Sequence, residues 1–249
     1  MTNWWNIKAK SDGCKRSNED ECNFCKRSIK KRAISTKNEG NLFSASFFVE
    51  IARFVSAMLS VRPANSTDFS AILELQERNH LSNLDGQSLG DGFLTTYLTP
   101  EKLDELSAQN GVFIARGEAN SASELESELA GFACGHFWDF SDEHEFHRAV
   151  LGLFPLALGE LSITANNSFQ YRPVCIAARL RGQGIIRVLS ENLKGSFRSR
   201  REFGISFIDH RNARSLAART RKAGFQVVAQ LPFGQTIHHV LGFSTQSSL

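Results

Sequence analysis

One segment of this chain reads Val174-Cys-Ile-Ala-Ala-Arg-Leu-Arg-Gly-Gln-Gly-Ile-Ile-Arg-Val-Leu189. Its first residues are typical of a buried strand, and its last residues have the apolar spacing of an amphipathic helix. The turn between them contains Gly182 and Gly184, which let a ligand approach the backbone closely. Because the first N–H groups of a helix have no partner inside it and the helix dipole favours negative charge there, the segment predicts a pyrophosphate site.

The turn resembles the acetyl-CoA-binding motif of the GNAT acetyltransferases, Q/R-x-x-G-x-G/A. The matching run is Arg181-Gly-Gln-Gly-Ile-Ile186, with Ile176 upstream at the family's usual spacing. Ile186 stands where the motif has Gly or Ala, whereas a shifted register that begins at Arg179 satisfies the motif literally. We use the first register, because it keeps the family's spacing between the strand and a helix that starts near Gly184.

A second resemblance lies downstream. Arg211-Asn-Ala-Arg-Ser-Leu216 and then Lys222-Ala-Gly-Phe225 are similar to the family's Asn-x-x-Ser/Ala helix, which ends in Gly-Phe. Gly224 is the expected helix stop. With Val61-Arg-Pro-Ala64 in front, the resemblance covers residues 60–243 in the family's order.

The resemblance implies the GNAT fold, an α/β fold of the mixed α+β kind. A central, mostly antiparallel sheet has splayed parallel strands 4 and 5, with helices on both faces. The residue patterns also predict a mixed order of strands and helices. The predicted strands are 61–64, 112–115, 130–138, 172–177, 203–208, 225–230 and 236–243, with 112–115 and 130–138 forming a hairpin; the predicted helices are one that begins at Asp68 and those over 100–108, 142–158, 184–197 and 213–222.

The family resemblance implies that acetyl-CoA is the acyl donor and that no metal takes part. The implied cofactor-binding residues are Val174, Cys175, Ile176, Arg181, Gly182, Gln183, Gly184, Ile185, Ile186, Asn212 and Ser215. The acceptor is a primary amine on a small molecule or a peptide, and its identity is left open. The function predicted from these matches is N-acetyl transfer by direct attack of the amine on the thioester.

The catalytic groups are less well defined by the sequence. By the resemblance, the backbone N–H of Ile176 is the expected oxyanion donor. Asp209 is the candidate general base, with His210 beside it and Glu160 as a weaker candidate, although a solvated loop is the more common explanation for the pair Asp209 and His210. The family often has a tyrosine general acid about four residues before Gly-Phe, where this chain has Arg219 and Thr220. The missing tyrosine keeps open an alternative function, a CoA-binding regulatory module with weakened catalysis.

The composition argues against a disordered, a secreted or a membrane-spanning protein. The 249 residues carry a net charge of +3, and 41% of them are hydrophobic, so we expect a globular chain without a dominant electrostatic partner. The odd set of five cysteines and the lack of a secretory signal predict a cytoplasmic protein, and residues 42–59 are too short and charged to span a membrane. The histidines, His238 among them, show no metal-like grouping, and we assign them no role. A homodimer is left open.

Residues 1–59 are predicted to be a basic extension before an acyltransferase domain at 60–249. Its residues 44–59 have the pattern of an amphipathic helix, but Met58 could also be the natural start, which would make the first 57 residues an extended reading frame. Cys22 and Cys25 have the gap of a zinc knuckle, yet only Cys14 adds a third thiolate, so we predict no metal. A solvated arm is favoured over a nucleic-acid-binding one.

Overall fold

The computed structural model describes residues 59–84, 89, 92–117, 129–138 and 145–246. All of them belong to one compact unit, Val49–Glu118 with Ser127–Leu249. The cysteine pair Cys22 and Cys25 and the predicted helix at 44–59, apart from Leu59, lie outside the described residues. The domain boundary near residue 60 therefore stays a prediction.

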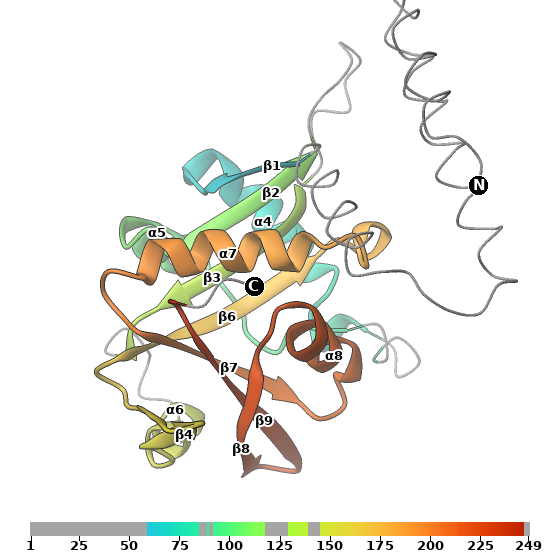
Figure 1. The fold of residues 1–249 in the computed structure, drawn as a ribbon. Coiled ribbons are helices and arrows are strands. Elements are labelled where there is room, and N and C mark those ends of the chain that lie inside the picture. Colours follow the sequence, from blue (N-terminus) through green and yellow to red (C-terminus); the bar gives the residue numbers. More distant parts are fainter. Residues whose placement is uncertain (1–58, 85–88, 90–91, 118–128, 139–144, 247–249) are drawn as a thin grey trace, which may run out of the picture. The chain divides into compact units, whose positions relative to one another are not determined.

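Seven strands form one sheet in the order β1-β2-β3-β6-β7-β9-β8 (Figure 1). Among these strands only β6 and β7 run parallel, and every other neighbouring pair is antiparallel. A separate antiparallel pair is formed by β4 and β5. The strands are β1 (Leu59–Pro63), β2 (Val112–Gly117), β3 (Leu129–His136), β4 (Leu156–Leu158), β5 (Leu161–Ile163), β6 (Ser168–Ile176), β7 (Phe203–Asp209), β8 (Gln226–Phe233) and β9 (Thr236–Ser244).

Helices cover both faces of this sheet. The long helix α7 lies across β1, β2 and β3 on one face, and α4 and α5 pack on the opposite face (Figure 1). No helix in the described ranges is both long and apolar enough to cross a bilayer. The helices are α4 (Phe69–Glu77), α5 (Pro100–Ala108), α6 (Glu145–Leu151), α7 (Ile185–Phe197) and α8 (Ala213–Lys222), with short 3-10 turns at Ser66–Asp68, Leu81–Asn83 and Ala178–Leu180.

The alternation of side chains along β2 builds the two cores. Phe113 and Ala115 join the cluster under α7, whereas Val112 and Ile114 join the cluster under α4 and α5. This two-residue period is the one that a strand buried on both faces requires.

A β-bulge in β6 changes this pattern next to the centre of the sheet. Ala133 of β3 lies opposite Val174, but Gly135 lies opposite Tyr171, so β6 has one extra residue near Arg172 and Pro173. As a result, Tyr171 packs in the α7 cluster while Cys175, four residues later, packs in the α4 and α5 cluster. A bulge bends its strand and increases the local twist, which directs the end of β6 away from β7.

The divergence of β6 from β7 is the feature that the predicted fold requires. Their pairing is limited to residues 168–170 of β6 against 203–205 of β7. The rest of β6 keeps its pairing with β3 through Ile176. The predicted splayed parallel strands are therefore confirmed.

The predicted elements agree with the structure except in one region. The helices predicted at 100–108 and 213–222 have the observed bounds, and the 112–115 and 130–138 hairpin is formed by β2 and β3. The helix predicted over 142–158 is wrong in its second half, because α6 ends at Leu151 and β4 begins at Leu156. Gly152 weakens the helix there, and Pro155 has no N–H to continue it.

Gly204 is predicted to be essential for packing between β7 and β9. A Cβ at this position would lie 2.1 Å from Cζ of Phe243, whose ring is buried and stacked on Phe225 with 4.0 Å between centroids. Gly204→Ala should lower the free energy of unfolding by about 1–3 kcal/mol, measured by urea denaturation, because the ring has little room to move.

The matched control is Gly195→Ala on the exposed side of α7, where a Cβ meets nothing within 4 Å. This change should raise stability by about 0.5–1 kcal/mol, because alanine loses less backbone entropy than glycine in a helix. Equal effects of the two substitutions would contradict the packing argument.

Candidate functional site

The turn between β6 and α7 presents unpaired backbone donors. Gly182 and Gly184 adopt left-handed conformations, with φ of 84° and 86°, that other residues rarely take. Among the residues that the structure describes, none accepts a backbone hydrogen bond from the N–H groups of residues 182–186. With α7 beginning at Ile185, these donors and the helix dipole have the arrangement that the predicted anion site requires.

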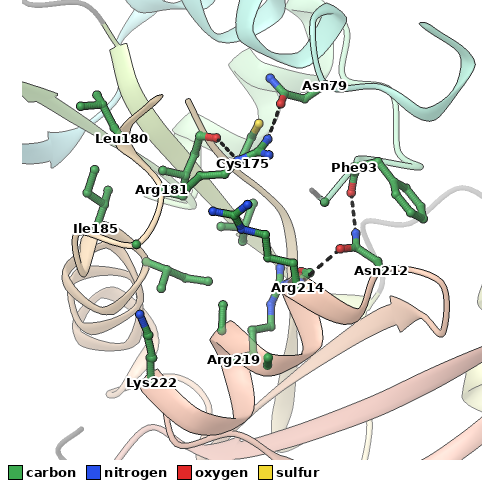
Figure 2. A pocket seen from close by; sticks show the side chains of 18 of the residues that line it. Asn79, Phe93, Cys175, Leu180, Arg181, Ile185, Asn212, Arg214, Arg219 and Lys222 are labelled. Atoms are coloured by element: carbon green, nitrogen blue, oxygen red, sulfur yellow. Dashed lines mark hydrogen bonds between the residues drawn. The ribbon is translucent and has the colours of Figure 1, made fainter. Parts of the chain in front are cut away.

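Arg181 holds this turn in place. Its Nε donates to the carbonyl oxygen of Ile176 at 3.1 Å, and its Nη2 donates to Oδ1 of Asn79 at 2.5 Å (Figure 2). The Nδ2 of Asn79 donates in turn to the carbonyl oxygen of Leu75 at 2.8 Å. The side chain thus ties the turn to the end of β6 and to α4, which indicates a structural role beside any contact with a ligand.

The free edge of β6 leads directly to this turn. The N–H of Ala177 donates to the carbonyl oxygen of Ala130 at 2.9 Å, so residues 175 and 177 direct their backbone groups toward β3. Val174 and Ile176 alternate with them and direct their N–H and C=O groups toward the side that β7 has left. This orientation is the one that the predicted oxyanion role of the Ile176 N–H needs.

A pocket of about 320 Å³ lies between this edge, the turn and α8. Of the predicted cofactor-binding residues, only Gln183 does not line it, and the side chain of Gln183 is exposed. Ten of the eleven predicted residues are therefore brought together around one pocket: Val174, Cys175, Ile176, Arg181, Gly182, Gly184, Ile185, Ile186, Asn212 and Ser215. Burial raises the pKa of Cys175 to about 12, which keeps this thiol protonated.

Helix α8 contributes the opposite wall. Asn212 caps the helix by accepting from the N–H of Ser215 at 3.2 Å, and its Nδ2 donates to the carbonyl oxygen of Phe93 at 2.8 Å. Ile185 and Leu180 face α8 across the pocket (Figure 2). Helix α8 also adds four cations to this wall, to which the resemblance gave no cofactor-binding role; the high share of basic residues in this one helix was the signal for them: Arg214, Arg219, Arg221 and Lys222.

A second pocket, of about 250 Å³, adjoins the first. It lies between the diverging strands on the side of β7 and β9, and it is bordered by Arg172, Asp209 and His238. The two pockets meet, because they share six lining residues: Phe93, Leu94, Val174, Asn212, Ser215 and Arg219. A group passed from a ligand in one pocket to a ligand in the other would have to lie beside these residues.

The strand order and the diverging parallel pair at its centre now identify the fold. The described part of the chain has the GNAT fold. No protein-family model and no curated protein matches the chain.

Several solved structures are similar to the GNAT fold described here. A GCN5-related N-acetyltransferase from Kribbella flavida is 17% identical, with 76% of this chain and 99% of that chain covered and a TM-score of 0.48. An acetyltransferase of the GNAT family from Streptococcus pneumoniae is 15% identical, with 75% and 98% covered and a TM-score of 0.46. A structure of the NatC complex bound to Gag peptide and CoA is 12% identical, with 75% and 98% covered and a TM-score of 0.49.

Arg219 lies near the position where the GNAT resemblance leads one to expect a tyrosine. Its side chain is 5% exposed and borders both pockets. It donates from Nη1 to Oγ of Ser215 and lies over the ring of Tyr171, but its Nε has no partner among the described residues. Burial lowers the pKa of Arg219, and no carboxylate in the described ranges forms an ion pair with it.

Asp209 lies at the end of β7 and borders the second pocket, as the prediction of a catalytic base requires. Its carboxylate is committed to Arg211, which donates from its backbone N–H, from Nε and from Nη2 at 2.9, 3.0 and 2.6 Å. Burial opposes ionisation, but the bonds from Arg211 outweigh it and hold the pKa at about 2. A carboxylate with so low a pKa is a weak base, so the geometry disfavours the predicted role.

His238 is a residue to which the sequence analysis gave no role. It lies opposite Asp209 in the β7–β9 pairing and borders the second pocket, with its ring 4.9 Å from that of Phe146. Burial lowers its pKa, so the imidazole is neutral at pH 7 and is able to accept a proton. Strand pairing brings it to the site, and no local spacing in the sequence indicates this.

Arg211→Ala should raise the pKa of Asp209 from about 2 toward its ordinary value near 4, because the charge and the two side-chain hydrogen bonds of Arg211 are lost while burial and the backbone N–H bond of residue 211 remain. The measurement is a ¹³C NMR titration of the aspartate carboxyl groups. In the wild type, the stability that this pair provides should be present above about pH 4 and should be lost as the pH falls toward 2. A titration curve unchanged by the substitution would show that Arg211 does not set this pKa.

Proposed function

We propose that this protein is an acyl-CoA-dependent N-acyltransferase that transfers the acetyl group of acetyl-CoA to a primary amine. The observation that carries this proposal is the continuity of three features. The unpaired edge of β6 leads into free N–H groups at the start of α7, and the pocket along them opens into a second pocket. Acetyl-CoA would fit in the first pocket, along the edge of β6 and the turn. The amine would reach the thioester end of acetyl-CoA through the second pocket.

In the proposed complex, the pantetheine arm lies along residues 174–176 like an added strand and bonds to the outward N–H groups of Val174 and Ile176 and to the C=O of Val174, since the C=O of Ile176 accepts from Arg181. The pyrophosphate rests on the N–H groups of residues 182–186. The cationic side chains at the far end of α8, Arg221 and Lys222, are placed for the remaining phosphate charge. Asn212 and Ser215 lie beside the thioester end, where the two pockets meet.

The chemistry follows from this placement. The amine nitrogen attacks the thioester carbonyl, the carbonyl oxygen gains negative charge, and the backbone N–H of Ile176 stabilises it. The C–S bond then breaks and the electron pair leaves on sulfur, while the amine gives up a proton. The neutral imidazole of His238 is better suited than Asp209 to accept that proton; an unchanged kcat in His238→Gln would remove this assignment.

We assign to Arg219 the stabilisation of the departing thiolate. Its guanidinium is buried where the two pockets meet and has no carboxylate partner in the described chain, so a developing anion there would be its complement. Arg219 keeps its proton, because even a guanidinium with a lowered pKa remains charged near pH 7. Electrostatic stabilisation would therefore replace the proton transfer that a tyrosine performs.

The second candidate function is a CoA-binding regulatory module. The observation that favours it is the same absence of a tyrosine before Gly224. The two functions differ in one measurable property, the release of free thiol from acetyl-CoA in the presence of a panel of amines. Binding of acetyl-CoA without any thiol release would support the module.

Gly184→Glu should abolish acetyl-CoA binding, measured by isothermal titration calorimetry, because it adds bulk and negative charge against the proposed pyrophosphate site. Gly159→Glu is the matched control, since Gly159 also has a positive φ, of 61°, and also has open space around a Cβ. The control carries the same backbone strain and charge at a turn that lines neither pocket described above. Equal affinities in the two variants would refute the site assignment.

Arg219→Met should lower kcat at least tenfold while leaving the protein as stable as before or about 1 kcal/mol more stable. The reason is that methionine fills similar volume without a buried, unpaired charge. Arg221→Met, on the exposed side of the same helix, should instead weaken acetyl-CoA affinity and leave kcat near the wild-type value. Loss of stability without loss of kcat in Arg219→Met would show that the arginine is structural.

A further inference from the structure

Arg172 is a second cation without an ionic partner among the described residues, and its side chain is half-buried. It lies at the bulge of β6, and its Nε donates to Oε1 of Gln170 at 3.1 Å. Its guanidinium carbon lies 5.7 Å from the ring centroid of Phe146 and 5.6 Å from that of Phe207. A neutral amide and two aromatic rings do not balance its charge. Burial lowers its pKa to about 10, so it is still cationic at neutral pH.

The other charged groups around this pocket leave the cation uncompensated. Asp209 is the one carboxylate among its described lining residues, and both of its oxygens are bonded to Arg211. Arg219 adds a further cation to the wall, and His238 is neutral at pH 7. The pocket therefore complements an anionic group, since two cations line it and its one described carboxylate is already bonded to Arg211.

The remaining walls combine apolar and aromatic side chains with four polar ones, Thr95, Thr96, Asn212 and Ser215. Three half-buried phenylalanines border the pocket, and their rings contact one another edge to face, with centroids 5.6 Å apart for Phe146 and Phe207 and 5.1 Å for Phe146 and Phe233. We call this second pocket the aromatic pocket; Phe146, Arg172, Phe207, Phe233 and His238 are among the residues that line it. Its volume of about 250 Å³ is below the ~300–1,000 Å³ usual for drug-sized ligands, so its occupant is small.

From these observations we infer that the aromatic pocket binds the acceptor as a small amino carboxylate with an apolar side chain, such as a free aromatic amino acid. Arg172 pairs with the carboxylate, and the phenylalanine rings hold the side chain. The assignment of the ligand as an acceptor rests on the proposed acyltransferase function. The assignment of a carboxylate to Arg172 does not, because it follows from the charges of the pocket alone.

This arrangement also brings the amine to the reacting position in a reactive form. Val174, two residues beyond Arg172, borders both pockets, as does Arg219. A carboxylate held at Arg172 would leave the amine of the same molecule within reach of the place where the pockets meet. The positive charges of Arg172 and Arg219 disfavour an ammonium group there, which favours the neutral amine that the attack requires.

The first test measures binding alone. Calorimetry with saturating CoA compares 3-phenylpropanoate with its amide, 3-phenylpropanamide, which has the same ring and chain but no charge. The wild type should bind the carboxylate at least tenfold more tightly. Arg172→Met should lose this preference, Arg172→Lys should keep part of it, and Arg148→Met, an exposed cation on α6, should keep all of it. Equal binding of the two probes by the wild type would overturn the inference, and this comparison needs no variant.

The second test separates this inference from the proposed function. Acetylation of L-phenylalanine and of L-phenylalaninamide is compared through kcat/KM, and the free amino acid should be preferred at least tenfold. Equal rates for both would leave the acyltransferase standing and overturn the amino carboxylate assignment. Carboxylate binding that depends on Arg172, with no acetylation of any amine, would support the pocket assignment and refute the acyltransferase function.

Discussion

The divergence of β6 from β7 is the constraint on which the rest of this structure depends. One extra residue near Arg172 and Pro173 bends β6, and its pairing with β7 ends at Gln170. Backbone groups at the centre of a sheet would normally be paired with a neighbouring strand, so an unpaired edge there is costly unless something else bonds to it. The proposed pantetheine arm is a partner of that kind, and the two pockets lie on either side of the opening.

Charge is distributed around the opening in two different ways. Asp209 and Arg211 satisfy each other, as do Asp68 and its partners Arg62 and Arg116 farther along the sheet. Such pairs stabilise the fold and offer little to a ligand. Arg172, which is half-buried, and Arg219, which is buried, lie by contrast beside the pockets with no carboxylate partner in the described chain. Because an unpaired buried cation opposes folding, we interpret these two residues as serving ligands: a carboxylate in one case and a thiolate in the other.

The sequence predicted the elements well where local signals were strong. Helix α5 begins with the proline and threonine cap that a helix start prefers, and α8 has an asparagine cap and ends before Gly224, so both were predicted with the correct bounds. The helix predicted over 142–158 was wrong beyond Leu151, because apolar residues that belong to β4 continue the helical pattern past Gly152. Short apolar runs do not distinguish helix from strand, and tertiary pairing with β5 decided this one.

Some features of the candidate site were likewise determined by local sequence, and others only by the tertiary structure. The sequence by itself determined the anion-binding turn at 181–186 and the capped helix that faces it, because glycine conformation, helix N-termini and caps depend on residues adjacent in the chain. Only the tertiary structure decided that Arg172 and Arg219 have no ionic partner among the described residues and that His238 borders the second pocket. These properties depend on strand pairing and on burial between segments far apart in sequence, and no local pattern of residues records them.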